Sequence, residues 1–439
     1  MQQIKTNGGI IKIVGLLGAY SGTKRLELQQ KLLSGNKFTE ESGSEINSKL
    51  KDQYYPEFRN IMFYKDNSRN PGAELLCRRY ICSEKHDVTF VWKKEGGLRE
   101  LPIAVNQCEI FLFPNQISLF SLRLSYDFGN ATIDNISDLI NLCRNFDAET
   151  SAESKDGRMK WHEWITEKYL VGEKLRGAHV LADEFSGSKF KVFSVFDINL
   201  DQAERDAVLY DFGTSSPPGS GKGAGHWAPH PDYLRTVMSS KVSYYNNWES
   251  LCLFDSFTTV GSGILSNIFM HKTWEFTYFR IYLFRLFFKY NLFRYNTELH
   301  DNTVKLRNQF EDFLTSYQLS HISFNFLPNE LYSKIGSALH LDEELHTFQH
   351  RINRISSAIQ EERQSRTNAL LQFVTVLGGL SSVQPVFDGL SIAQKYLGWS
   401  DRLFYTLLVL ILLGIGTGIL AFLMPELVRK VKIRLFGRN

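Results

Sequence analysis

Cysteine and net charge are both scarce in this sequence of 439 residues. The five cysteines are an odd number, are scattered and form no Cys-x-x-Cys pair, so the sequence indicates neither a disulfide framework nor a zinc site. The formal net charge of +3 is small for this length, and we therefore expect no nucleic-acid partner. No uninterrupted apolar run with a cleavage site occurs in the first thirty residues, so we expect no signal peptide and a cytoplasmic N-terminal part.

Recognisable catalytic signatures are also missing. We find no Ser-His-Asp, Cys-His or paired-carboxylate arrangement, and we expect a protein that is not an enzyme. His346 and His350 are four residues apart and follow Glu343 and Glu344, a spacing that can hold a metal ion. They lie off the apolar face of the expected helix, so we favour a solvated helix surface, and any metal site stays unknown.

Residues 1–265 are expected to form a cytoplasmic α/β domain. Short apolar or β-branched runs predict strands, and apolar residues at helical spacing predict helices. The mixture of the two over roughly 265 residues is enough for a core of its own. The expected strands are Ile10–Val14, Ile61–Tyr64, Val88–Val91, Ile110–Phe113 and Val192–Phe196. The expected helices are Ile133–Phe146, Trp161–Leu170 and Gln202–Tyr210.

Residues 266–366 are expected to form a helical bundle and a stalk. Trp274–Tyr295 is rich in aromatic side chains, but charged residues interrupt it every four or five positions, which predicts a buried helix rather than a membrane span. Asn296–Leu319 predicts a second helix. From Ala338 on, apolar residues recur at alternating spacings of three and four, as in a coiled-coil seam. We therefore expect one helix to run from about Pro328 into the following segment.

Two segments within residues 367–424 predict transmembrane helices. Leu403–Met424 has no charge over 22 residues; at about 1.5 Å per residue it would span about 33 Å, against a hydrocarbon core of about 30 Å. Thr367–Phe387 is the other long uncharged stretch, and the seam continues through it in phase. The basic tail at 425–439 indicates a cytoplasmic C-terminus. An even number of crossings follows, with a short outer loop at 388–402.

Small or uncharged polar residues form a stripe on one face of the first expected span. Lipid disfavours such groups and a water-filled channel accepts them, so we interpret the stripe as pore-lining. The alternative is a chance alignment on a helix that packs against its neighbours. Two helices of one copy cannot enclose a pore, so a ring of identical subunits is required. The stripe consists of Asn368, Gln372, Thr375, Gly379 and Ser382.

Two features near the expected spans allow more than one interpretation. In a ring, Asp388 would recur around the outer pore mouth and favour cations, or it simply belongs to a helix-ending Asp-Gly turn. Gly414 and Gly418 have the small-xxx-small spacing that lets helices approach closely in lipid, or they only reduce side-chain bulk.

The loop at residues 213–233 is similar to a phosphate-binding loop but departs from its pattern. Its GSGKG stretch offers glycines and a lysine, yet Ser216 takes the first glycine position and Gly223 replaces the Ser or Thr that should bind magnesium. A nucleotide hydrolase is therefore not expected. The loop either closes over a small anionic ligand that can stack, or is an inert insertion. The candidate ligand-binding residues are Lys222, His226 and Trp227.

The order of these parts, from cytoplasmic domain to basic tail, resembles the CorA family of divalent-cation transporters. Residue-level similarity lies in "IYLFRLFFKYNLFRY" at 281–295, which looks like the aromatic-rich helix before the family's stalk. It also lies in "TNALLQFVTVLGGLSSVQPVF" at 367–387, which is similar to the start of the family's pore helix. The resemblance implies a CorA-like homopentameric funnel in the bacterial inner (cytoplasmic) membrane, with both termini in the cytoplasm.

One departure from the family concerns the pore mouth. The family's Gly-Met-Asn motif is replaced by "QPVFDGLSIAQ", so transport of Mg²⁺ does not carry over from the resemblance. The altered mouth and the enlarged cytoplasmic domain look like a CorA-like branch that accompanies type III CRISPR systems. In that branch a nucleotide messenger, such as a SAM–AMP conjugate, gates a membrane effector.

Three hypotheses for function follow. The first is a CorA-like ion channel that a nucleotide-type messenger gates, acting as an antiviral effector. The second is a constitutive Mg²⁺ or other divalent-cation transporter with a substituted pore mouth. The third is a membrane-anchored nucleotide-processing enzyme. The expected partners are further copies of the chain as a homopentamer, membrane lipid, and a small anionic or nucleotide ligand.

Overall fold

The computed structural model of the chain forms two compact units, Met1–His350 and Arg351–Asn439, which we describe one at a time. The structure describes residues 6–20, 22–41, 51–63, 77–94, 96–113, 117–151, 157–173, 189–223, 225–298, 303–381, 383–398 and 400–423.

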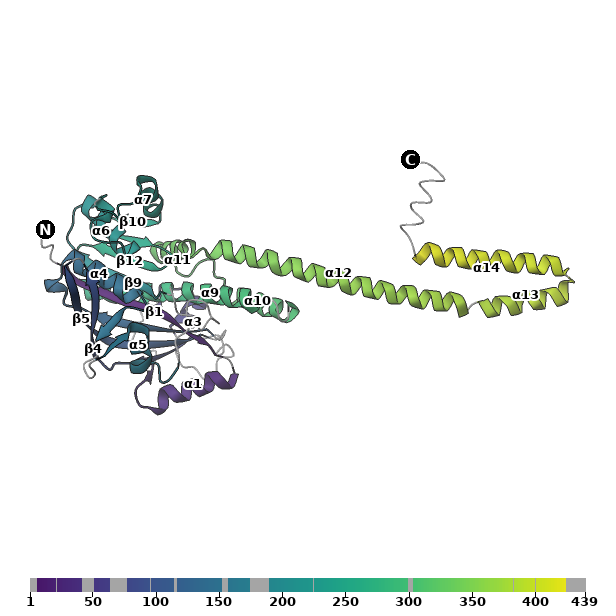
Figure 1. Cartoon of the computed structure of the whole chain (residues 1–439), viewed down its shortest axis with the longest axis horizontal. Helices are drawn as coiled ribbons and strands as arrows, with labels where there is room; N and C mark the ends of the chain where they lie inside the picture. Colours follow the sequence, from purple (N-terminus) through teal and green to yellow (C-terminus); the bar gives the residue numbers. More distant parts are fainter. Residues whose placement is uncertain are drawn as a thin grey trace. The chain divides into compact units, whose positions relative to one another are not determined.

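A mixed sheet of 12 strands organises the first unit (Figure 1). Its strands are β1 (Thr6–Ala19), β2 (Thr39–Glu40), β3 (Arg78–Cys82), β4 (His86–Lys94), β5 (Gly97–Leu112), β6 (Ile117–Ser125), β7 (Glu149–Ser151), β8 (Arg158–Lys160), β9 (Lys191–Ile198), β10 (Lys241–Tyr245), β11 (Trp248–Cys252) and β12 (Ser256–Gly261). Their order is β10-β11-β12-β9-β1-β6-β5-β4-β7-β8, and β3 pairs with both β2 and β5. Among the described strands, β9 and β12 form the parallel pair and the other pairings are antiparallel.

Helices lie on both sides of this sheet (Figure 1). They are α1 (Gly22–Ser34), α3 (Pro56–Met62), α4 (Ile133–Arg144), α5 (Trp161–Tyr169), α6 (Gln202–Thr214), α7 (Pro231–Met238), α8 (Ile268–Lys272), α9 (Phe279–Glu298), α10 (Thr303–Tyr317) and α11 (Phe326–Ala338). Shorter helical turns are η2 (Phe128–Asn130), η3 (Ser220–Lys222) and the π-helical η4 (Thr273–Tyr278).

The sheet is the middle layer of the first unit. On one side, Ile11 and Ile13 of β1 pack in a core with Leu139 of α4 and Leu209 of α6. On the other side, the ring of Phe279 in α9 meets Phe111 and Phe193 of the sheet. Because helices cover both faces, all eight residues of β9 are buried.

Local sequence signals explain where α4 and α6 begin. The Thr132 hydroxyl accepts a hydrogen bond from the Asn135 backbone amide at 3.2 Å, and the Asp201 carboxylate accepts one from the Glu204 amide at 2.8 Å. Each bond satisfies an amide that has no partner inside the helix. These two helices carry walls of the cavity described below.

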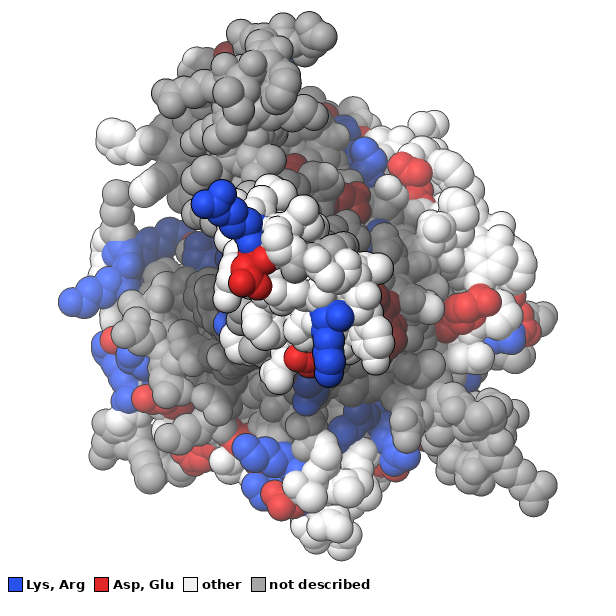
Figure 2. Space-filling model, turned by 90° about the vertical axis from the view of Figure 1, so that its right-hand side faces the viewer, with Lys and Arg blue, Asp and Glu red and all other residues white. Residues whose placement is uncertain are grey.

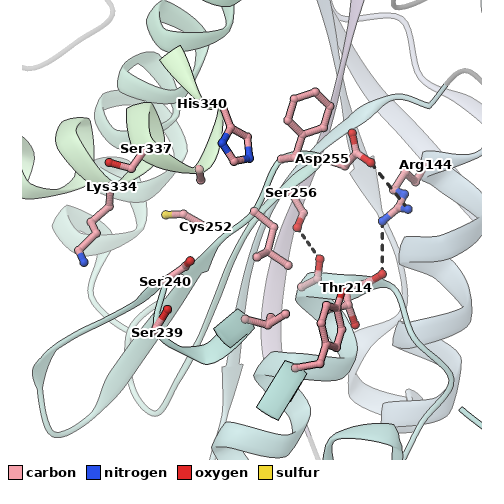
Figure 3. Close-up of a pocket in the computed structure, with 16 residues that line it drawn as sticks. Arg144, Thr214, Ser239, Ser240, Cys252, Asp255, Ser256, Lys334, Ser337 and His340 are labelled. Carbon is pink, nitrogen blue, oxygen red and sulfur yellow. Dashed lines mark hydrogen bonds and ion pairs between the residues drawn. The ribbon is translucent and has the colours of Figure 1, made fainter. Parts of the chain in front are cut away.

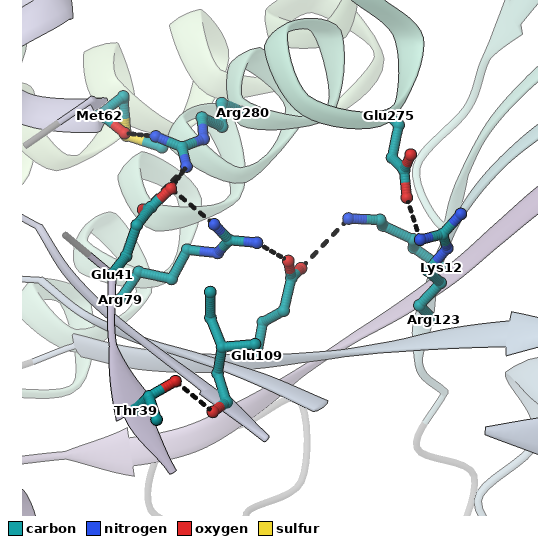
Figure 4. Close-up of polar contacts among 10 residues, drawn as sticks. Lys12, Thr39, Glu41, Met62, Arg79, Glu109, Arg123, Glu275 and Arg280 are labelled. Carbon is teal, nitrogen blue, oxygen red and sulfur yellow. Dashed lines mark hydrogen bonds and ion pairs between the residues drawn. The ribbon is translucent and has the colours of Figure 1, made fainter. Parts of the chain in front are cut away.

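A chain of buried ion pairs ties α9 to the sheet (Figure 4). Lys12 of β1 lies 3.2 Å from Glu109 of β5, which also binds Arg79 of β3. Arg79 continues the chain to Glu41 at 2.7 Å, and Glu41 binds Arg280 of α9 at 2.9 Å. The partners alternate in sign, so each buried charge faces an opposite one, as buried charges in proteins require.

The strand and helix predictions for the first unit are largely confirmed. Four of the expected strands lie in β1, β4, β5 and β9, and the three expected helices correspond to α4, α5 and α6. The strand expected at Ile61–Tyr64 is wrong, because α3 starts with Pro56 at its first position and extends to Met62. The buried aromatic helix expected at Trp274–Tyr295 is present as η4 and α9.

The second unit begins within a long helix, at Arg351, and continues with a pair of shorter helices. Helix α12 (Leu341–Ser381) is followed by α13 (Val383–Leu397) and α14 (Asp401–Leu423). Phe387 of α13 and Phe404 of α14 have ring centroids 6.1 Å apart, and Gln394 donates to the Asp401 carboxylate at 2.7 Å. Figure 2 views the molecule from the right-hand side of Figure 1 and shows basic and acidic side chains interspersed with uncharged ones.

The prediction of two transmembrane helices at 367–424 is wrong. Within the described part of the chain, no helix combines the length and the apolar character that crossing a bilayer requires. The described residues of the first expected span belong to α12 and to the start of α13, and α13 continues past Phe387 with Asp388 and Lys395.

The fold class and location built on those spans need the same correction. The structure has a large mixed sheet with helices in place of a membrane funnel, so the CorA-like fold, the membrane character and the inner-membrane location are contradicted. The expected outer loop at 388–402 is helical up to Leu397. The basic tail at 425–439 lies outside the described residues.

Candidate functional site

A cavity of about 480 Å³ opens in the first unit between the turn that joins β11 to β12 and the ends of several helices (Figure 3). Its volume is within the usual range for a site that holds a small molecule, roughly 300–1,000 Å³. The lining combines basic, hydroxyl and apolar side chains. The residues used below are Arg144, Thr214, Phe254, Asp255, Lys334 and His340.

Arg144, the last residue of α4, fixes one wall of the cavity. Its guanidinium donates to the Thr214 carbonyl at 3.3 Å and to the Ser215 hydroxyl at 3.2 Å. A third contact reaches the Asp255 carboxylate at 3.8 Å (Figure 3). The α4 terminus is thereby bound to both the α6 terminus and the β11–β12 turn.

A buried lysine of β9 binds the β11–β12 turn. Lys191 of β9 donates to the Asp255 carboxylate at 2.6 Å and to the Phe254 carbonyl at 3.0 Å. Its ammonium group also lies 3.9 Å from the centre of the Phe254 ring. Burial lowers the pKa of Lys191, while Asp255 acts in the opposite direction. Phe254 therefore lines the cavity while its ring contacts the Lys191 ammonium group.

The opposite wall comes from α11 and the residues that follow it. Lys334, Ser337 and Ala338 belong to the last turns of this helix, and His340 lies just beyond it (Figure 3). The His340 ring is 6.4 Å from the Phe254 ring. Lys334 is partly exposed, so its ammonium group is accessible to a ligand that enters from solvent.

The thiol of Cys252 is part of the lining but does not favour nucleophilic chemistry. The side chain is buried, and burial raises the pKa of this thiol. A thiol that stays protonated is a poor nucleophile. Cys252 therefore contributes packing to the cavity wall.

The three candidate ligand-binding residues of the 213–233 loop do not line this cavity. Lys222 forms an ion pair with Glu204 at 3.6 Å. His226 is exposed, and the Trp227 side chain is 72% exposed. The structure places these side chains on the surface, and their role in binding stays a prediction.

Asp211 occupies the amide groups that a phosphate-binding loop would offer to a ligand. Its two carboxylate oxygens accept hydrogen bonds from the backbone amides of Gly219 and Gly221, each at 2.7 Å. Burial raises the pKa of Asp211 to about 6, although the two amides and Lys222 act in the opposite direction. The loop is therefore held by a carboxylate of its own chain, which explains why it only resembles a phosphate-binding loop.

The expected pore-lining residues lie on one stretch of the second unit. Asn368, Gln372 and Thr375 are on α12, with Asn368 and Thr375 exposed. Thr375 donates to the Leu371 carbonyl at 2.8 Å, a bond within its own helix. Of the other two residues of the stripe, Gly379 lies on α12 outside the described side chains, and Ser382 lies outside the described residues.

Asp388, the expected pore-mouth residue, is exposed within α13, where its carbonyl accepts from Ser391 at 2.8 Å. No cluster of three or more potential metal ligands occurs among the described residues. In the described part of the chain, His346 and His350 therefore have no third side chain with which to form a metal site.

The sequence did not indicate the cavity residues, because they come from five separate segments. Arg144, Thr214, Asp255 and Lys334 approach one another only after the sheet has formed and α11 has packed beside β11. No pair of them has a recognisable spacing along the chain. One available signal was the short Leu253–Ser256 turn between two apolar strands, which brings Phe254 and Asp255 to an exposed corner.

Comparison with known proteins does not add a relative. No family model matches this sequence, and neither a curated protein nor a solved structure matches it. The resemblance to the CorA family stays a prediction from the residues quoted above.

Proposed function

We propose that the first unit binds a small phosphorylated ligand of nucleotide type in the cavity between the β11–β12 turn and α11, and so acts as a sensor. The single observation that carries this proposal is the charge of the cavity. Two cationic side chains and one carboxylate line it, and two further lysines contact the ring of Phe254, each paired with a carboxylate. The cations are Arg144, Lys191, Lys289 and Lys334, and the carboxylates are Asp255 and Glu344.

An excess of positive charge in a partly enclosed site favours an anion, and phosphate is one of the anions that Arg and Lys bind well. The remaining lining suits the rest of a nucleotide. Phe254 and Tyr233 offer aromatic rings for a base, and Ser239, Ser240 and Ser337 offer hydroxyl groups for a sugar.

The arrangement supports binding better than turnover. The carboxylate in the lining, Asp255, already accepts from Lys191 at 2.6 Å and faces Arg144 at 3.8 Å. A general base needs a free acceptor near the reacting group. We therefore keep the expectation that the protein is not an enzyme as part of the proposal.

Equilibrium binding to the purified full chain tests the proposal. The panel is ATP, a cyclic dinucleotide and a SAM–AMP conjugate, with adenosine as the uncharged control. We expect at least one phosphorylated compound to bind and adenosine to bind more weakly. Lys334→Gln should weaken binding by about tenfold or more, because a hydrogen bond to a charged group is lost.

The matched control is Lys93→Gln, which removes one positive charge from β4, at a strand far from the cavity in the sheet order. It should leave binding unchanged. Equal losses in both variants would show only a general effect of charge, and the absence of binding by every phosphorylated compound would contradict the proposal.

A further inference from the structure

The junction between α11 and α12 contains a backbone conformation that the sequence did not predict. One continuous helix was expected from about Pro328, but α11 ends at Ala338 and α12 begins at Leu341. His340 between them has φ = 55°, in the left-handed region that is unfavourable for residues with a Cβ atom. The break therefore exists against the local preference of the chain.

We propose that His340 is a two-state hinge, broken in this structure and helical in a second state in which α11 and α12 form one continuous helix. The sequence supports the continuous state. Ala338, Leu341 and Leu345 keep the three-then-four spacing across the break, so a continuous helix would hold them on one face.

Contacts from α9 and from α12 itself stabilise the broken state. Lys289 of α9 donates to the Leu339 carbonyl at 2.9 Å and also binds Glu344. In a continuous helix the Leu339 carbonyl would instead accept from the Glu343 amide. The first turn of α12 is acidic, which is favourable where a helix begins. The same lysine thus stabilises the end of α11 and the start of α12.

The hinge shares residues with the cavity. Lys334, Ser337 and Ala338 line it from before the break, and His340 lines it from the break itself. Lys289 also lies 4.8 Å from the centre of the Phe254 ring. Straightening the chain at His340 would therefore change the wall of the cavity that these residues form. A ligand there would favour that state because it binds it better, a consequence that rests on the function proposed above.

A pair of substitutions at one position tests the hinge without a ligand. His340→Gly and His340→Ala both remove the imidazole, including its contact with Glu343 at 3.2 Å. Glycine adopts the left-handed conformation readily, whereas alanine favours the helix. In the continuous state the amides of Leu341, Asp342 and Glu343 gain helical hydrogen bonds.

The readout is hydrogen exchange of residues 339–343 in the full chain. We expect exchange to be about fivefold slower or more in His340→Ala than in His340→Gly, since glycine and alanine differ by roughly 1 kcal/mol in a helix interior. Equal rates, or slower exchange in the glycine variant, would overturn the proposal. Lys289→Met is a second variant, and removing its hold on Leu339 should also slow exchange; faster exchange would count against the hinge.

The coupling to the cavity is measured with ATP and with the SAM–AMP conjugate. The glycine variant should bind the probe about fivefold more tightly than the alanine variant, because it remains in the broken state. Equal affinities would refute the coupling. If neither probe binds the wild type, the proposed function fails, whereas the exchange result for the hinge stands independently.

Discussion

The Lys12 ammonium group and the Glu109 carboxylate lie 3.2 Å apart in the interior of the first unit, with each side chain about 1% exposed. Glu109 also binds Arg79, so one buried carboxylate faces two buried cations. Burial alone would raise the pKa of Glu109, but Arg79 and Lys12 outweigh it and lower the pKa to about 2. The network that joins the sheet to α9 therefore depends on this carboxylate.

Glu109→Gln is expected to destabilise the fold strongly. The substitution leaves Lys12 and Arg79 buried without their shared partner, and breaking a buried ion pair in this way costs about 3–5 kcal/mol. Urea unfolding of the full chain measures the change. The control is Glu149→Gln at the exposed pair with Arg158, which should cost less than about 1 kcal/mol.

The same carboxylate predicts a loss of stability in acid. Its pKa in the folded protein, about 2, is below the value of about 4.3 for an unperturbed glutamate. The ionised form therefore adds stability above pH 4.3, and this contribution disappears as the pH falls from about 4.3 to about 2. Unfolding free energies over this range should fall more steeply in the wild type than in Glu109→Gln.

Asp211 predicts the opposite pH dependence. Its pKa is raised to about 6, so the folded protein holds a proton that the unfolded chain has already lost. Stability should therefore decrease as the pH rises from about 4 to about 6. Asp211→Asn does not titrate, and the difference in stability between wild type and variant should change over this window. A constant difference from pH 4 to 7 would contradict the assignment.

Gly221→Ala tests the packing of the loop that Asp211 holds. A Cβ atom at Gly221 would lie 2.5 Å from the Ala207 carbonyl oxygen and 2.9 Å from its Cα, both backbone atoms of α6. Since backbone cannot yield as a flexible side chain does, we expect a loss of about 1–3 kcal/mol. In Gly129→Ala the nearest atom is at 3.5 Å, and thermal unfolding of this control should be almost unchanged.

The first unit was predictable where local signals agree with the tertiary fold. The apolar run at Val192–Phe196 and the helical spacing at Ile133–Phe146 and Gln202–Tyr210 were sufficient to place β9, α4 and α6, and the caps at Thr132 and Asp201 agree with these starts. The segment at Ile61–Tyr64 was misassigned because its β-branched and aromatic residues suit a strand, while Pro56 at the first position of α3 started a helix.

The break at His340 and the cavity could not be read from the apolar pattern. The seam continues in phase across the break, and the contrary signal was the acidic run Asp342–Glu344, which is typical of a helix start. Lys289, which binds the Leu339 carbonyl, is fifty residues away along the chain. Charged residues that meet only through tertiary packing leave no mark on local spacing.

The most direct test of the central claim is the affinity of the full chain for ATP, a cyclic dinucleotide and a SAM–AMP conjugate, measured for wild type, Lys334→Gln and Lys93→Gln. If the cavity holds the ligand, a phosphorylated compound binds the wild type and Lys93→Gln equally, and binds Lys334→Gln about tenfold more weakly or worse. Binding that is unaffected by Lys334→Gln would place the ligand outside the cavity and contradict the proposed function.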